Sequence, residues 1–227
     1  NELTVVPKNP LNDTGIVSSG GGTSGSNESC TTAINNGGHV PQDCDQGRDA
    51  DLTLTKVGAG VAAFDFTKIA SDGSALTAQG GAWAADGSEA AGTRWSCVRD
   101  NVTGLVWEMK TEANAGIHAT NAKVVWADRN LLADATNTEA LCGIQNWRVP
   151  TVVELATIVN ANRLNPALDI ARFPNGAGAH WASNPVAGDG ANGWVVNFFA
   201  GIPILKGKTL GMSQRLVSGS YQANDTS

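Results

Sequence analysis

The sequence lacks several features that assign a protein quickly to a functional class. Charged residues make up only 16% of its 227 residues, and the net charge of −6 provides no basic excess. Duplex nucleic acid and anionic membranes both attract basic surfaces. No apolar run approaches the roughly 18 residues that a membrane span needs. We therefore expect neither nucleic acid binding nor direct membrane insertion.

Metal and redox motifs are also missing. The three histidines are scattered, and none of the four cysteines belongs to a C-x-x-C pair, so the spacing supports neither zinc nor thiol redox chemistry. An even cysteine count in a charge-poor chain rich in Gly, Asn, Ser and Thr is typical of two disulfides in an exported protein. Among the three connectivities we favour the sequential one, Cys30–Cys44 and Cys97–Cys142. Since no signal peptide is present, we expect the numbering to begin at a mature N-terminus.

Catalytic motifs are absent as well. The sequence contains neither the G-x-S-x-G nucleophile elbow nor the H-E-x-x-H zinc motif. The cysteines that could act as nucleophiles are accounted for by the expected disulfides. We therefore predict no catalytic residues and no enzymatic activity.

The first fifty residues differ from the rest of the chain. Residues 1–8 (NELTVVPK) predict a short strand, and a Gly/Ser-rich lead-in with two cysteines follows it. We divide the chain into this lead-in (1–50), a domain (51–220) and a tail (221–227). The lead-in is a candidate assembly segment, which would add a strand to a sheet edge of a neighbouring copy.

An acidic stretch in the lead-in, "DCDQGRDAD", is a candidate calcium site. Its four carboxylates come from Asp43, Asp45, Asp49 and Asp51. Calcium prefers several oxygen ligands, so a structural calcium ion is the one cofactor to consider, although none is required. However, Leu54 stands where an EF-hand has its bidentate glutamate. A solvated acidic turn with Arg48 as counter-ion is the favoured alternative.

Two segments have the apolar spacing of helices. Residues 121–135 predict a helix with Asn121 as N-cap. Residues 152–160 predict a second helix, which begins with a capping box formed by Thr151 and Glu154.

Other segments predict strands. Residues 94–110 indicate two strands around a turn, and the alternation from Leu105 to Lys110 is typical of a half-buried strand. Three later strands are predicted at 180–185, 193–201 and 211–219. The order of strands, helices and strands indicates an α+β fold with an antiparallel sheet.

These segments together resemble a known family. "DNVTGLVWEMKT", "LCGIQNWRVPTVVEL" and "HWASNP…GWVVNFFAG…SQRLVSG" resemble the C-terminal domain family of the bacterial collagen-like surface adhesin. That family shares the patterns D-x-x-T-G-L-x-W and C-G-x-x-x-W-R-x-P-T-x-x-E-L. The resemblance covers roughly residues 12–219, including "NDTGI" and "CDQGRDAD". It implies a C-type lectin-like fold, with two helices packed on a small curved antiparallel sheet and a loop-rich, disulfide-tied N-terminal extension. It also implies a non-enzymatic exported or surface-anchored bacterial protein, and some members form trimers.

In lectin-like folds the loops between the late strands hold the ligand, which corresponds to residues 183–211 here. The candidate ligand-binding residues are Trp181, Asn184, Asp189, Asn192, Lys206 and Lys208. Their composition suits a glycan. Trp181 fits an aromatic floor and a core position equally well, whereas Trp194 alternates in phase with Val196 and Phe198 and is favoured as core. The E-P-N, Q-P-D and W-N-D triplets of calcium-dependent lectins are absent, and the acidic net charge does not match sulfated-polysaccharide binding.

Trp147 and Arg148 allow two interpretations. They would form a stacking platform with an anion clamp, or Trp147 would fill the core beside Cys97–Cys142 while Arg148 binds carbonyls or an internal acid. Their position between a cysteine and a capped helix favours the second interpretation.

We therefore predict a secreted, cell-surface-associated structural or adhesive module that assembles with copies of itself into a surface assembly or fibre. The alternative is a lectin-like domain that binds a glycan or a host or cell-surface protein through residues 183–211.

Overall fold

The computed structural model describes residues 12–16, 18–20, 27–29 and 64–221. Several predictions lie outside these residues, namely the strand at 1–8, the Cys30–Cys44 disulfide and the calcium site of Asp43, Asp45, Asp49 and Asp51. A short antiparallel hairpin of β1 (Ser18–Gly20) and β2 (Asn27–Ser29) belongs to the lead-in.

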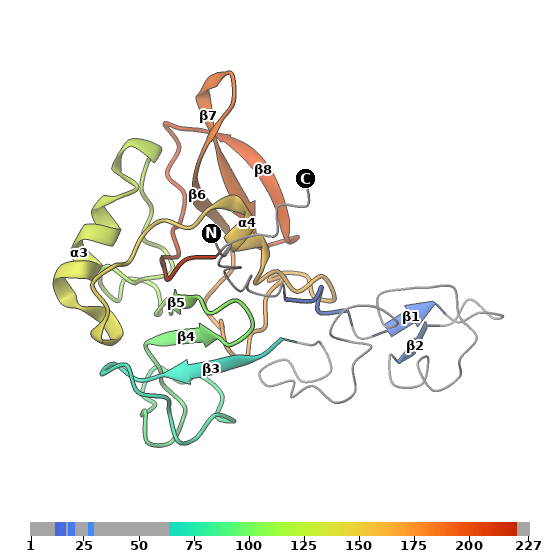
Figure 1. Ribbon diagram of the computed structural model, residues 1–227, viewed down its shortest axis with the longest axis vertical. Coiled ribbons are helices and arrows are strands. Elements are labelled where there is room, and N and C mark those ends of the chain that lie inside the picture. The colour runs from blue at the N-terminus through green and yellow to red at the C-terminus, as the bar shows by residue number, and fades with distance from the viewer. Residues whose placement is uncertain (1–11, 17, 21–26, 30–63, 222–227) are drawn as a thin grey trace, which may run out of the picture.

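The first main sheet is four-stranded, with the order β3-β4-β5-β9 (Figure 1). Its neighbouring strands are all antiparallel. The strands are β3 (Phe66–Ile69), β4 (Cys97–Asp100), β5 (Val106–Glu108) and β9 (Val217–Ser218). β4 and β5 confirm the two strands predicted within residues 94–110.

The second main sheet is a three-stranded antiparallel meander with the order β6-β7-β8. Its strands are β6 (Ala179–Val186), β7 (Asp189–Asn197) and β8 (Ile202–Gly207). Figure 1 shows this sheet above the first one, with α4 between them. Together with the helices, the two small antiparallel sheets confirm the α+β class.

The first helix differs from its prediction. α3 spans Leu131–Glu139, and only a short 3-10 turn, Trp126–Asp128, precedes it. Val124 instead exchanges two backbone hydrogen bonds with Met212, both of 3.0 Å. Asn121 is not an N-cap, because its side chain binds Asn114. Tertiary pairing has therefore overridden the local helical spacing.

The second helix has the predicted beginning but an earlier end. α4 spans Val152–Ala156, and the complete capping box between Thr151 and Glu154 confirms the prediction. The helix ends before residue 160, since the Asn160 N–H donates to the carbonyl of Ala167 at 3.1 Å rather than continuing the helical ladder.

Trp147 lies in a core cluster beside the Cys97–Cys142 disulfide, as the favoured interpretation predicted. A second 3-10 turn, Leu141–Gly143, positions Cys142 for this bond. Arg148 also takes its favoured role: its guanidinium binds both carboxylate oxygens of Glu154, at 2.8 and 2.5 Å, and the Gly219 carbonyl at 2.7 Å. This conspicuous segment is therefore part of the frame.

The main core joins the two sheets and α4. The fully buried residues of this core include Trp107 on β5, Val196 on β7 and Phe198, which directly follows β7. Trp194 packs against this core. The prediction of a half-buried strand is wrong, because Glu108 and Lys110 on the other face are also buried.

Candidate ligand-binding site

Three predicted residues meet at the tip of the β6–β7 hairpin. The Asp189 carboxylate accepts from the Asn192 side chain at 2.6 Å and from the backbone N–H groups of Ala191 and Asn192. Hydrogen bonds from Asn192 hold the pKa of Asp189 below its usual value. The Lys208 ammonium donates to the Gly190 carbonyl at 3.0 Å. The polar groups of this tip are thus occupied in shaping the turn.

Two other predicted residues serve packing. Trp181 has no exposed surface and its indole N–H donates to the Val124 carbonyl at 2.8 Å, so the prediction of an aromatic floor is wrong. It packs edge-on against Trp126, with ring centroids 5.3 Å apart. Gly193 makes room for this pair, since a Cβ there would lie 2.6 Å from the Trp126 ring. Asn184 accepts the Val152 N–H at 2.7 Å and so secures the start of α4.

Lys206 lies at a different place, in a hollow of about 480 Å³. β6, β8, the end of β7 and residues 120–123 and 211–213 surround it. Its polar lining comes from Thr120, Asn121, Lys123, Asn197, Lys206 and Ser213, and we call this hollow the basic pocket. Among the residues that the structure describes, none contributes a carboxylate to its lining, in a chain with a net charge of −6.

The ammonium groups of the two lysines in the basic pocket are available to a ligand. Neither Lys123 nor Lys206 forms a side-chain hydrogen bond or an ion pair with any residue that the structure describes. Two further cations lie against Trp126, which shares a hydrophobic cluster with Ile204 and Met212 of the pocket lining: the Arg129 guanidinium is 4.4 Å and the Lys208 ammonium 5.4 Å from its ring centroid. This side of the sheet therefore has a local positive charge. Sequence reasoning found Lys206 but missed Lys123, which stood in the segment predicted as a helix.

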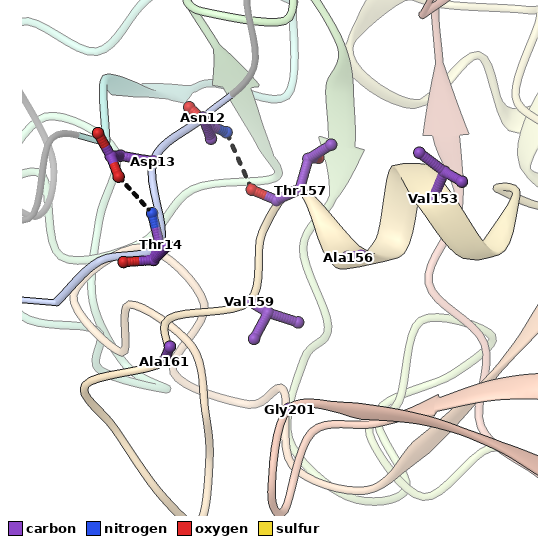
Figure 2. A pocket seen from close by; sticks show the side chains of 9 residues that line it. All are labelled: Asn12, Asp13, Thr14, Val153, Ala156, Thr157, Val159, Ala161 and Gly201. Carbon is purple, nitrogen blue, oxygen red and sulfur yellow. Dashed lines mark hydrogen bonds between the residues drawn. The ribbon is translucent and has the colours of Figure 1, made fainter. Parts of the chain in front are cut away.

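A second hollow, of about 340 Å³, has a different character. Figure 2 shows residues 12–14 facing α4 and Val159 across it. Two of its polar side chains are engaged: the Asn12 amide N–H donates to the Thr157 carbonyl at 3.0 Å, and Asp13 accepts from the Thr14 N–H at 2.8 Å. Valine and alanine side chains form the remaining walls, so the hollow offers little to a polar ligand.

A buried charge cluster, which the sequence did not reveal, lies between β5 and α3. Glu108 Oε1 is 2.7 Å from the Lys110 ammonium and 2.6 Å from His118 Nδ1, while Oε2 accepts from the Leu216 N–H at 2.8 Å. Burial alone would raise the pKa of Glu108, but Lys110 and His118 lower it to about 2. On its other side His118 binds Glu139 at 3.0 Å. The charges satisfy one another, which is the arrangement expected of a structural cluster.

Lys68 is a second buried cation. Its ammonium donates to the carbonyls of Gly81 and Gly92 and lies 3.9 Å from the centroid of the Trp95 ring. Burial, with Arg172 nearby, lowers its pKa to about 8. An amine with this pKa would suit nucleophilic chemistry, but Lys68 has no exposed surface through which a substrate would reach it.

In the ranges that the structure describes, no three His, Cys, Asp or Glu side chains gather as metal ligands. The helices found there are all too short or too polar to span a bilayer.

The fold and the basic pocket define a small disulfide-bonded α+β module with a polar, cationic hollow. Residues 96–218 match the family described as the Lcl C-terminal domain. Because this match covers more than half of the chain, the protein belongs to that family. The resemblance seen in the sequence is thereby confirmed at the level of the family and over residues 96–218, and both lysines of the basic pocket fall within the matched residues. No curated protein matches the chain.

Proposed function

We propose that this chain is a non-enzymatic, extracellular adhesion module with a C-type lectin-like fold that binds a glycan bearing acidic groups in the basic pocket. Membership of the Lcl C-terminal domain family favours a surface or adhesion role. The observation that carries the ligand assignment is the pairing of Lys123 and Lys206 in one hollow without a carboxylate. Sulfate or carboxylate groups of the glycan would bind the ammonium groups, and Asn197 and Ser213 at the wall would face its hydroxyls.

The absence of a catalytic role is part of this proposal. Two groups with strongly shifted pKa values are enclosed in the core: Glu108 and Lys68 have no exposed surface. A catalytic acid or base has to reach the atom whose proton it moves. The lysines of the basic pocket, by contrast, line an open hollow, which suits binding.

The expected affinity of one pocket is low. A solvent-exposed ion pair contributes roughly 0.2–1 kcal/mol, so two lysines account for up to about 2 kcal/mol, or about thirtyfold in affinity. Useful adhesion would therefore need several pockets acting together on one polymer. This requirement supports the second part of the proposal, which is that copies of the chain associate on the cell surface.

A direct test compares retention on an immobilised sulfated polysaccharide with retention on neutral dextran at low and high salt. We expect the double variant Lys123→Ala/Lys206→Ala to lose about two- to thirtyfold in affinity, and the affinity of the unmodified chain to fall with salt. The matched control is Arg99→Ala/Arg163→Ala, which removes the same charge from exposed positions outside the pocket. An equal loss in both double variants would show that net charge, rather than the pocket, governs retention.

Calcium binding at Asp43, Asp45, Asp49 and Asp51 stays a prediction. A thermal shift assay with calcium and with chelator tests it, and identical transitions in the two would count against the site.

A further inference from the structure

The two main sheets have four edges, and in the four-stranded sheet both edges are covered. At the β3 edge the Gln79 side-chain amide replaces a neighbouring strand: it accepts the Lys68 N–H at 2.8 Å and donates to the Lys68 carbonyl at 3.1 Å. At the β9 edge Arg148 exchanges two backbone hydrogen bonds with Val217, both of 3.0 Å. Covered edges resist pairing with other chains.

One edge of the three-stranded sheet is covered in the same way. Along β6, the Ser213 N–H donates to the Ala179 carbonyl at 3.1 Å, and the Ser213 carbonyl accepts from the backbone N–H of Trp181 at 3.0 Å. The remaining edge is the outer side of β8, which Figure 1 shows at the margin of the sheet.

The register identifies the backbone groups on this outer side. The Lys208 N–H donates to the Ala191 carbonyl at 2.9 Å, one step beyond the last pair of β7 and β8. Hydrogen-bonded and non-hydrogen-bonded pairs alternate along an antiparallel ladder. The N–H and C=O groups of Pro203, Leu205 and Gly207 therefore point away from β7. Proline fits this assignment, because it has no N–H to donate to the ladder.

The outward groups form a self-complementary set. The Gly207 carbonyl already accepts from the Leu210 N–H at 3.0 Å, and Pro203 has no donor. Four groups then have no backbone partner among the residues that the structure describes: the Pro203 carbonyl, both groups of Leu205 and the Gly207 N–H. When two β8 strands lie antiparallel about a twofold axis at Leu205, the two Leu205 residues bond each other. Each Gly207 N–H then reaches the Pro203 carbonyl of the other copy, and every remaining group has a partner.

We propose that β8 is the self-association edge of this protein and that two copies join into one continuous six-stranded sheet. A twofold interface of this kind uses the same patch on both copies. An unrelated strand would present a carbonyl opposite Pro203 and find no donor, so the proline favours a second copy over other partners. The inference rests on the proposed self-association and specifies its surface and symmetry.

The side chains at this edge are compatible with the pairing. Ile202 and Leu205 are 49% and 43% exposed, so the pairing would bury apolar surface. In this register Lys206 lies opposite Ile204 of the second copy, and no like charges face each other. Since the twofold axis is perpendicular to the sheet, both basic pockets come to the same face. The dimer would then hold one polyanionic chain at two points, which raises its effective affinity.

The first test uses sedimentation velocity over a concentration series. We expect the unmodified chain to form dimers and Leu205→Lys to raise the dimer dissociation constant at least about tenfold, because two like charges meet at the axis. The control Leu131→Lys changes a leucine that is 61% exposed on α3, and it should leave the constant within about twofold. A monomer at every concentration, a trimer, or a Leu205→Lys variant that still dimerises normally would each overturn the proposal.

The second test fixes the register. Residues of a hydrogen-bonded pair have Cα atoms about 5.5 Å apart, within the range of a disulfide. Oxidised Leu205→Cys should therefore migrate as a covalent dimer on a non-reducing gel, whereas Leu131→Cys and the unmodified chain should not. Absence of the cross-linked dimer overturns this register. In a parallel experiment Lys123→Ala, which changes the basic pocket outside β8, should still dimerise, so failure of the edge and failure of the glycan site are distinguished.

Discussion

Replacement of Lys110 by methionine should leave the Glu108 carboxylate in the core with one cation fewer. The two side chains are 0% and 1% exposed, and the distance from Lys110 Nζ to Glu108 Oε1 is 2.7 Å. Removal of one partner from a buried ion pair costs roughly 3–5 kcal/mol, because the other charge stays buried without compensation. His118 still binds the same oxygen at 2.6 Å, so we expect the lower end, about 3 kcal/mol.

Equilibrium unfolding in urea measures this loss, with the disulfide left oxidised. The midpoint should fall by about 1 M or more while the m-value is unchanged, since m is about 1–3 kcal/mol/M. The matched control is Glu108→Gln/Lys110→Met, which removes the carboxylate together with its lysine, and it should recover at least half of the loss. A Lys110→Met variant that loses less than about 1 kcal/mol would refute the reasoning, as would a double variant that loses the sum of the two single effects.

Three further predictions concern pH, the disulfide and the helix cap. Burial lowers the pKa of His118, but the carboxylate of Glu108 raises it above 6.5 overall. The stabilisation from protonated His118 is therefore complete below the unfolded pKa and is lost as pH rises through the folded pKa. The melting temperature should fall across this pH range, and in His118→Gln that step should be missing. Cys97→Ser/Cys142→Ser opens a link with a sequence separation of 45, which should cost about 4 kcal/mol in urea unfolding on the chain-entropy model, and a loss below about 1 kcal/mol would contradict it. Thr151→Ala removes the N-cap hydroxyl of α4 and should cost about 1 kcal/mol in thermal unfolding, whereas Thr151→Ser should recover most of that loss.

Local signals in the sequence predicted local structure correctly. The capping box of α4 depends on two residues three positions apart, and the strand at 193–201 depends on alternation within one segment. The capping box was found as predicted and the strand was found with shifted bounds, Asp189–Asn197, because the causes of both lie within a few residues. The Cys97–Cys142 pairing was also found, since few connectivities compete among four cysteines.

Features that depend on distant partners were not predicted. The segment around Val124 pairs with Met212, and no local pattern announces a partner so far along the chain. Likewise Glu108 has the periodicity of a solvent-facing position, but Lys110, His118 and the Leu216 N–H make its burial tolerable. The candidate site was half predicted for the same reason. Lys206 lies within residues 183–211, which were expected to bind the ligand. Lys123 lies far from them in the sequence and reaches the same pocket only through the tertiary fold.

Gly193 has a consequence for the evolution of this family. The Trp126 ring fills the space that a side chain at position 193 would need. A Cβ there would lie 2.6 Å from the Trp126 ring and 3.0 Å from the Trp181 ring. Position 193 is therefore coupled to position 126: a relative with a larger residue at the first should have a smaller one at the second. This coupled substitution provides a marker, readable from sequence alone, for members in which the tryptophan pair on the three-stranded sheet has been rebuilt.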